Sequence, residues 1–315
     1  MAKDAVMMRA EQIASEFLQE PALASYQIVG KGMVNQVLVI ETERNKVVVR
    51  MNDRNTYPSY IKEQWCIEQA AAAGIPSPRV LSVGISDDSA FMIQTFVEGE
   101  NGLDSGVLSR TEMWRRLGHN AKLIHAIPVR GYGENLVDQE QGEWRSPPHP
   151  GSDGSWQGYI RYNIHSLTDQ DPLIGLGVLT SKESLKVRQL FTNMSKESYR
   201  FGLIHGDLTL KNVLVDSTGQ LTVIDWGSAV AAPVPHGDLI HLLLHQLLEN
   251  GLNDEELHAY LDGYGMSRED LTMTRRLMLL KSFDTVRWAI DRSPDEVAAY
   301  AAIAQQVLLM LNELE

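Results

Sequence analysis

The order of hydrophobic and polar residues predicts a sheet-bearing N-terminal region. Apolar side chains recur at helical spacing over residues 5–19, and short β-branched runs then alternate with polar turns. Good helix formers fill a later stretch that stops at Gly74 and Pro76. The predicted elements are a helix over 5–19, strands at Tyr26–Val29, Val37–Ile40 and Val47–Arg50, a helix over Ile61–Ala73, and a buried strand over Phe91–Val97.

The rest of the chain reads as helical sequence around one small hairpin. Two β-branched runs, Val213–Val215 and Leu221–Ile224, flank the turn residues 216–219, which predicts an antiparallel hairpin. The predicted helices are Met113–His125, one that opens at Asp238, and about three over 254–315 that end with Val297–Leu314.

One segment of this second half has no sustained period. Residues 131–156 are rich in Gly, Pro, Ser and acidic side chains, so we expect a long loop. Trp144 and Trp156 are candidate apolar anchors there, although packing in a core is the more common fate of tryptophan.

Polar residues gather at both ends of the predicted hairpin. His205, Asp207, Lys211 and Asn212 come just before its first strand, and Asp225 comes just after its second. An antiparallel pairing is expected to bring Asp225 beside Asn212 and Asp207. Oxygen ligands of this kind suit Mg²⁺, which predicts a site for a Mg²⁺-nucleotide. The alternative is that these side chains only cap turns, as Asp and Asn often do.

Composition limits the classes of molecule that the protein is expected to bind. The 315 residues include 28 basic and 41 acidic side chains, for a net charge of −13, which argues against nucleic acid and leaves room for a cationic substrate. Solubility alone explains the acidity equally well.

The single cysteine, Cys66, falls in a predicted helix and is expected to be a buried, inert thiol, in keeping with a reducing compartment. Because no signal-like or membrane-spanning run is present, we expect a cytoplasmic protein that binds no membrane.

The spacing HGD-x₄-N from His205 to Asn212, followed by DWG at Asp225, resembles the catalytic loop and metal-binding triplet of the kinase fold. The HGD and DWG variants, together with VVVR and GIPSPRVL, resemble the aminoglycoside phosphotransferase family, which includes choline and other small-molecule kinases. The resemblance implies an α+β, bilobal protein-kinase-like fold. Its small antiparallel-sheet lobe would span residues 1–97 and bind nucleotide, with a hinge near 94–98, and its larger helical lobe would span 98–315.

The resemblance also implies how ATP is held. Gly30, Gly32 and Asn35 correspond to the phosphate loop, and Arg50 to the cation on the α- and β-phosphates. Glu63 corresponds to the helix glutamate that pairs with this cation, and Glu68 is the fallback.

The remaining residues that the resemblance assigns to the nucleotide site lie at the expected hinge. Gln94 corresponds to the gatekeeper, and the backbones of Thr95 and Val97 would meet the adenine edge.

The chemistry that the resemblance implies is phosphoryl transfer from ATP to a hydroxyl. Asp207 would orient the hydroxyl and accept its proton, while Asn212 and Asp225 hold Mg²⁺. Lys211 departs from the HGDLHPGN pattern of many relatives. It either reaches the transferring phosphoryl oxygens as a catalytic cation or lies in solvent.

Four polar residues lie outside this set. His125, in LIHAIP, is expected to be structural, and Asp238 is expected to cap its helix first and serve a site second. His241 and His245 share a helical face but lack the glutamate of a zinc motif, so zinc is not expected.

Several functions remain open. The acceptor is an aminoglycoside-type antibiotic, an amino alcohol such as choline, or a sugar, and the sequence sets neither the acceptor nor the oligomeric state. A non-catalytic nucleotide-binding module is the first rival, although such modules typically lack one of these residues. A Mg²⁺-dependent hydrolase is the second, but it leaves Arg50 and Glu63 unexplained.

Overall fold

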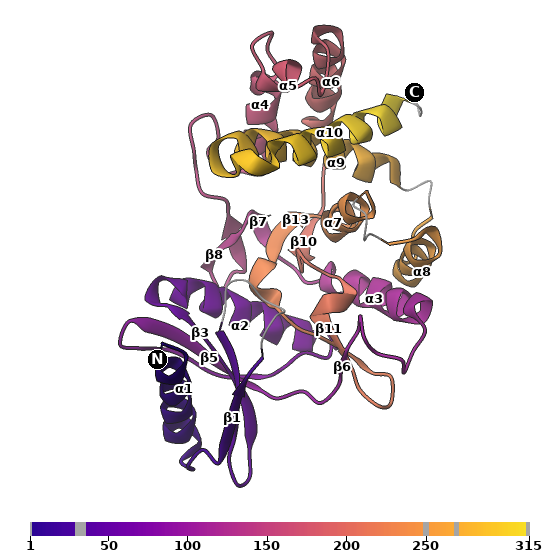
Figure 1. Cartoon of the computed structure of the whole chain (residues 1–315). Coiled ribbons are helices and arrows are strands. Elements are labelled where there is room, and N and C mark those ends of the chain that lie inside the picture. The colour runs from indigo at the N-terminus through magenta and orange to yellow at the C-terminus, as the bar shows by residue number, and fades with distance from the viewer. Residues whose placement is uncertain (1, 29–35, 248–251, 268–270, 313–315) are drawn as a thin grey trace. The chain divides into compact units, whose positions relative to one another are not determined.

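A computed structural model describes residues 2–28, 36–247, 252–267 and 271–312 (Figure 1). Two compact units form: the first comprises residues 1–109 and 210–229, and the second comprises 110–209 and 230–315. This division differs from the predicted lobes, since the hairpin and the DWG segment pack with the N-terminal sheet. The lobes at 1–97 and 98–315 stay a prediction, because packing alone does not show which residues bind nucleotide.

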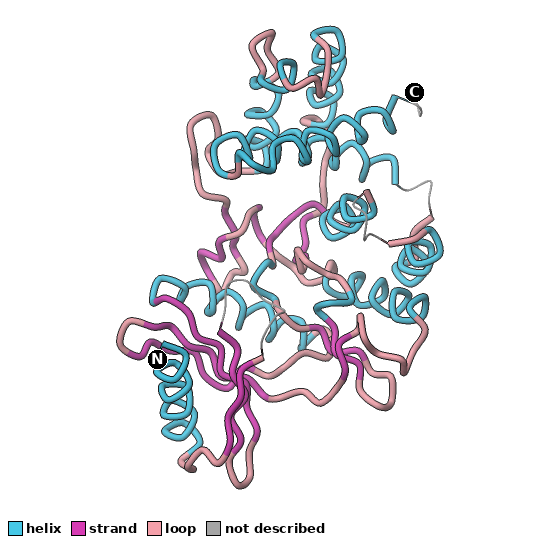
Figure 2. Tube along the Cα trace, viewed as in Figure 1, coloured by secondary structure: helices cyan, strands magenta, loops and turns pink. Residues whose placement is uncertain are grey.

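The first unit carries most of the strands and the second most of the helices, as Figure 2 shows by colour. The helices are α1 (Ala2–Leu18), α2 (Tyr57–Ala72), α3 (Arg110–Ile124), α4 (Trp156–Ser166), α5 (Pro172–Gly175), α6 (Ser181–Met194), α7 (His236–Gln246), α8 (Asp254–Tyr264), α9 (Leu271–Arg292) and α10 (Val297–Asn312). The strands are β1 (Ala24–Gln27), β2 (Gln36–Glu41), β3 (Lys46–Asp53), β4 (Val80–Ser86), β5 (Ser89–Thr95), β6 (Glu100–Asn101), β7 (Arg130–Tyr132), β8 (Asn135–Asp138), β9 (Glu143–Arg145), β10 (Phe201–Ile204), β11 (Val213–Val215), β12 (Leu221–Val223) and β13 (Val230–Pro233).

A five-stranded antiparallel sheet organises the first unit, in the order β1-β2-β3-β5-β4. Alternate residues of a strand point to opposite faces, so one strand can serve two helices. On β5, Ile93 packs with the core that α1 supplies through Ala10 and Ile13. Met92 joins the cluster around Tyr60 of α2. The sheet is therefore covered by one helix on each face.

The predicted hairpin is confirmed, and a third strand extends it. Val213 pairs with Val223 and Val215 with Leu221, in antiparallel register. The turn begins at Asp216, whose side chain accepts a hydrogen bond from the Thr218 N–H at 2.8 Å. β6 then pairs with β11 on its other side. This pairing joins the hairpin to the chain that leaves the large sheet.

In the second unit, α3 and α8 pack at unusually close range. A Cβ on Gly118 would lie 2.0 Å from the Tyr260 carbonyl oxygen, and one on Gly263 would lie 1.8 Å from the Arg115 carbonyl oxygen. Only glycine fits at either position, because any side chain would collide with the facing backbone. The predicted helix over 113–125 is thus confirmed as a core element.

The prediction of a loop over 131–156 is wrong. β9 lies between β7 and β8 in a small sheet, and Gly133 exchanges backbone hydrogen bonds with Ala231 of β13 at 2.9 Å. The strands of this small sheet contain a single β-branched residue, Val137, and so lack the β-branched runs that marked the hairpin strands, which is why the sequence pattern missed them. Trp144 is fully buried and Trp156 nearly so, so both are core residues rather than surface anchors.

Among the helices that the structure describes, none combines the length and the apolar character needed to cross a membrane.

Candidate active site

Strand alternation decides where Arg50 points. Its neighbours Val49 and Met51 belong to the core on the α1 side of the sheet, so Arg50 faces α2 from the middle of β3. The strand runs on to Asp53 rather than ending at Arg50 as the sequence suggested. On α2, Glu63 lies on the buried stripe one turn after Tyr60, and its Oε1 accepts a hydrogen bond from Arg50 Nη1. The predicted partners are therefore in contact.

This ion pair is buried on both sides, with 8% of the Arg50 side chain and 2% of the Glu63 side chain exposed. Burial acts against a charged guanidinium, but the carboxylates of Glu63 and Asp225 outweigh it and raise the pKa of Arg50 above its usual value. Glu68, the fallback partner, is exposed and accepts a hydrogen bond from Gln64 instead. The structure thus distinguishes the two glutamates.

Asp225 extends this arrangement to the segment after the hairpin. Arg50 Nη2 lies 3.3 Å from Asp225 Oδ1, and about half of the Asp225 side chain is exposed. Its backbone has φ 61° and ψ 61°, a left-handed conformation that costs a non-glycine residue about 1–2 kcal/mol. Such strain persists only where the surroundings impose it, and it often marks a functional position. The carboxylate is therefore held beside a buried cation yet open to a ligand.

Lys62 fixes the same segment from α2. Its Nζ donates hydrogen bonds to the backbone oxygens of Gly227 at 2.9 Å and Ala229 at 3.1 Å. α2 thus contacts both parts of the site. Its Glu63 binds the Arg50 guanidinium, and its Lys62 binds the backbone that follows Asp225. Sequence analysis missed Lys62, because a lysine on a helix is usually solvated and nothing local marks its target.

Asn212 lies where the hairpin pairing was expected to put it. Its backbone oxygen accepts a hydrogen bond from the Ile224 N–H at 3.0 Å, so it neighbours the residue before Asp225. One carboxylate and one amide oxygen suit Mg²⁺, which takes few protein ligands and completes its shell with water and phosphate oxygens. The predicted juxtaposition with Asp207 is not tested, because Asp207 belongs to the other compact unit.

The structure describes only some of the other residues that were predicted to bind the nucleotide. Gly30, Gly32 and Asn35 lie outside the described residues. Gln94 is buried in β5, and the Thr95 N–H already donates to the Arg79 oxygen at 2.9 Å. The Thr95 N–H is therefore already engaged, and the contact of this residue with an adenine edge stays a prediction. Val97 follows in the irregular segment 96–99, and its role stays a prediction.

Lys211 lies in a short 3₁₀ helix, Leu210–Asn212, and its side chain is exposed. Its backbone oxygen accepts a hydrogen bond from Asn101 Nδ2 at 2.7 Å, which fixes the backbone of the 3₁₀ helix. The catalytic role of Lys211 stays a prediction.

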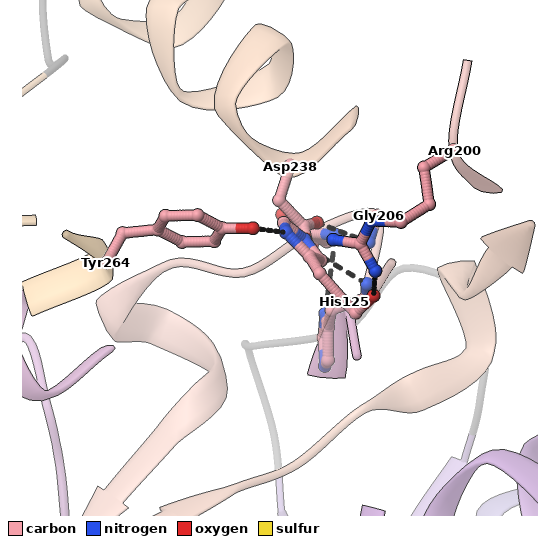
Figure 3. Close-up of polar contacts among 7 residues, drawn as sticks. His125, Arg200, Gly206, Asp238 and Tyr264 are labelled. Carbon is pink, nitrogen blue, oxygen red and sulfur yellow. Dashed lines mark hydrogen bonds and ion pairs between the residues drawn. The ribbon is translucent and has the colours of Figure 1, made fainter. Parts of the chain in front are cut away.

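In the second unit, Asp238 organises the loop that carries Asp207 (Figure 3). The fully buried carboxylate accepts hydrogen bonds from the backbone N–H of His205 at 3.0 Å and of Gly206 at 2.7 Å. Burial opposes the charge, but a hydrogen bond from the His125 ring, the nearby imidazoles of His125 and His205, and the Gly206 N–H lower the pKa of Asp238 overall. Gly206 has φ +79°, a conformation that explains glycine in the HGD segment.

The prediction that Asp238 caps its own helix is wrong. α7 begins at His236, so Asp238 lies within its first turn, and its oxygens bind another segment. The expected structural role of His125 agrees with its contacts. Its Nε2 contacts Asp238 Oδ2 at 3.0 Å, its Nδ1 contacts the Tyr264 hydroxyl at 3.1 Å, and its backbone oxygen accepts a hydrogen bond from Arg200 at 2.9 Å (Figure 3). The loop is thereby tied to α3, α7 and α8.

Cys66 is fully buried and plays no part in this arrangement. Burial raises the pKa of its thiol far above the usual value, which confirms the expected inert cysteine.

His236, at the start of α7, gives the protein a predictable response to acid. Burial, with a smaller contribution from His125, lowers its pKa from 6.5 to about 4, and its Nδ1 contacts the hydroxyl of Thr274 at 2.8 Å. The unfolded chain therefore binds a proton between these pH values and the folded chain does not. The contribution of His236 to the free energy of unfolding should be complete above pH 6.5 and should be lost as the pH drops toward 4. The loss from this residue is at most about 3 kcal/mol.

Urea unfolding of the wild type and of His236→Gln at several pH values between 7.5 and 4 measures this contribution. The wild type should lose stability relative to His236→Gln as the pH falls from 6.5 toward 4, because glutamine has no imidazole to protonate. A difference that stays constant over this range would show that His236 has the same pKa in both states.

Comparison with solved structures places this arrangement in a known fold. A thermostable mutant of aminoglycoside phosphotransferase APH(4)-Ia, solved in a ternary complex with AMP-PNP and hygromycin B, aligns over 95% of this chain and 97% of its own. The TM-score is 0.67 at 16% identity, a likeness that shows the fold. The fold is thus the protein-kinase-like fold that the sequence predicted.

The family itself follows from the sequence match. Residues 25–280 match the phosphotransferase enzyme family, APH, which is most of the chain. The protein belongs to this family.

Two curated relatives are similar over shorter stretches. The RIO-type serine/threonine-protein kinase Rio2 of Methanocaldococcus jannaschii is 40% identical over 88 residues, which are 25% of this chain and 31% of that protein. A probable ketoamine kinase of Staphylococcus aureus is 24% identical over 213 residues, which are 62% of this chain and 66% of that protein. The match thus spans less than two thirds of either relative.

Proposed function

We propose that the protein transfers the γ-phosphoryl group of ATP to a hydroxyl of a small polar molecule. The observation that carries this proposal is the buried pair of Arg50 and Glu63, with Asp225 at 3.3 Å from the same guanidinium. A desolvated ion pair is costly to bury, so its retention in the core calls for a reason beyond stability. A cation that is fixed in place to receive phosphate oxygens supplies that reason.

Each residue has a separate task in this scheme. Arg50 binds the α- and β-phosphates and Glu63 keeps the guanidinium oriented, while Asn212 and Asp225 are the ligands for Mg²⁺. The ion, when bound, neutralises charge that develops on the phosphate oxygens. Asp207 orients the acceptor hydroxyl and takes its proton. Catalysis then consists mainly of positioning and charge stabilisation.

The acceptor that we favour is a polar molecule bearing amines, of the aminoglycoside type. The net charge of −13 suits a cationic acceptor, and the structurally similar APH(4)-Ia was solved with hygromycin B. A ketoamine or other sugar derivative is the second candidate, because of the similarity to a probable ketoamine kinase. Choline and other amino alcohols remain alternatives on the family resemblance.

A screen tests the proposal and its rivals together. The protein is incubated with MgATP and single hydroxyl compounds from these classes, and products are sought by mass spectrometry as a gain of one phosphoryl group. ADP that forms only with an acceptor supports a kinase. ADP at the same rate without one supports a hydrolase, and nucleotide binding without turnover supports a non-catalytic module. Replacing Asp207 with Asn provides the inactive control.

Substitution of Lys211 tests whether its amine contributes to the phosphoryl-transfer step. If its amine reaches the transferring phosphoryl oxygens, Lys211→Met should lower kcat at least about tenfold, roughly 1.4 kcal/mol of transition-state stabilisation, with little change in ATP affinity. The matched control is Lys182→Met, at an exposed position on α6. Steady-state kinetics at saturating substrate separates the two outcomes, since an unchanged kcat would assign Lys211 to solvent.

A further inference from the structure

One histidine on α7 contacts the carboxylate that the proposed function uses as its base. His241 Nε2 lies 3.2 Å from Asp207 Oδ1, within a single compact unit, with 34% of the His241 side chain and 20% of the Asp207 side chain exposed. The pair is therefore partly sheltered and yet open to a small molecule. Neither the hairpin motif nor the family resemblance assigned His241 any task.

The contact follows from how α7 runs beside the loop. Asp238 and His241 are three residues apart, so they share one face of the helix. Asp238 binds the backbone N–H groups of His205 and Gly206, and His241 binds the side chain of the next residue. Successive turns of one helix thus hold successive residues of the loop. The contact of Asp238 fixes the loop backbone, and the contact of His241 fixes the Asp207 carboxylate.

Geometry also sets the state of the imidazole. A carboxylate only accepts hydrogen bonds, so the proton of neutral His241 lies on Nε2, facing Oδ1 of Asp207. A donor on Oδ1 restrains rotation of the carboxylate and gives Oδ2 a definite direction. An acceptor hydroxyl needs such a fixed partner, because an error of about 1 Å in placement can cost about a hundredfold in rate.

We propose that His241 is a positioning residue for Asp207, which it orients through the Nε2–H to Oδ1 hydrogen bond. This inference rests on the proposed function, since it gives Asp207 the task of orienting the hydroxyl. It adds a requirement that the catalytic loop does not contain: a hydrogen-bond donor from the second turn of α7.

Kinetics of three variants tests the requirement. His241→Ala removes the donor and should lower kcat about tenfold or more, while the KM for ATP stays within about twofold. His241→Gln keeps an N–H donor at a similar reach and should recover most of that loss. His165→Ala, at an exposed position on α4, is the matched control and should behave as the wild type. Equal losses in the Ala and Gln variants, or no loss in either, would overturn the proposal.

A second measurement does not depend on turnover. In protein labelled with ¹⁵N-histidine, the His241 ring signals are identified by their absence from His241→Gln. Their shifts at neutral pH should place the proton on Nε2, and they should change in Asp207→Ala. A proton on Nδ1, or ring signals unaffected by Asp207→Ala, would refute the contact. Wild-type protein that phosphorylates no acceptor would defeat the proposed function instead and leave this result standing.

Discussion

Replacing Asp207 with Asn is expected to stop phosphoryl transfer while MgATP binding stays close to that of the wild type. The amide keeps the shape of the side chain but cannot take the hydroxyl proton, and loss of a positioned base typically costs about a hundredfold to ten thousandfold in rate. We assign no nucleotide contact to Asp207, which lies in the second compact unit. Turnover and nucleotide affinity, measured on the same preparation, check both parts of this expectation.

Asp225→Asn is the matched comparison, because it makes the same chemical change at the proposed metal ligand. It should weaken binding of MgATP itself, as the carboxylate next to Arg50 loses its charge. The affinity for ATP measured without Mg²⁺ should change less than the affinity for MgATP. Equal losses of nucleotide binding in the two variants would contradict the assigned division of tasks.

The second large effect concerns Arg50 and Glu63, which should act as a unit. Arg50→Ala and Glu63→Ala should each lower turnover by at least about tenfold, and the double variant should be scarcely worse than Arg50→Ala alone. The reason is their buried contact: once the guanidinium is gone, Glu63 has nothing left to position. Stability must be followed in parallel, since breaking a buried ion pair can cost about 3–5 kcal/mol.

Glu68→Ala provides the control on the same helix, since Glu68 is exposed and does not pair with Arg50. It should leave turnover and its coupling to Arg50 unchanged. Additive losses for Arg50 and Glu63 would mean that the two side chains contribute separately.

Local sequence was enough for the elements that carry strong periodic or turn signals. The hairpin was predictable because β-branched runs flank Asp216 and Gly219, and α2 because helix formers end at Gly74. Spacing within the HGD and DWG motifs indicated the kinase-like fold before any contact was known. The pairing of Arg50 with Glu63 was predicted from the family resemblance, and the structure confirms the contact.

Contacts between distant segments required the tertiary structure. Nothing near Asp238 in the sequence shows that its carboxylate binds the backbone of His205, and nothing near His241 shows that its ring meets Asp207. The small sheet around Trp144 was missed because its strands lack the β-branched runs that marked the hairpin. Sequence by itself therefore determined the elements that carry strong periodic or turn signals and the chemistry that their motifs suit. Only packing decided the partners of the buried polar groups, because a buried donor or acceptor must be satisfied by whatever segment the fold brings to it.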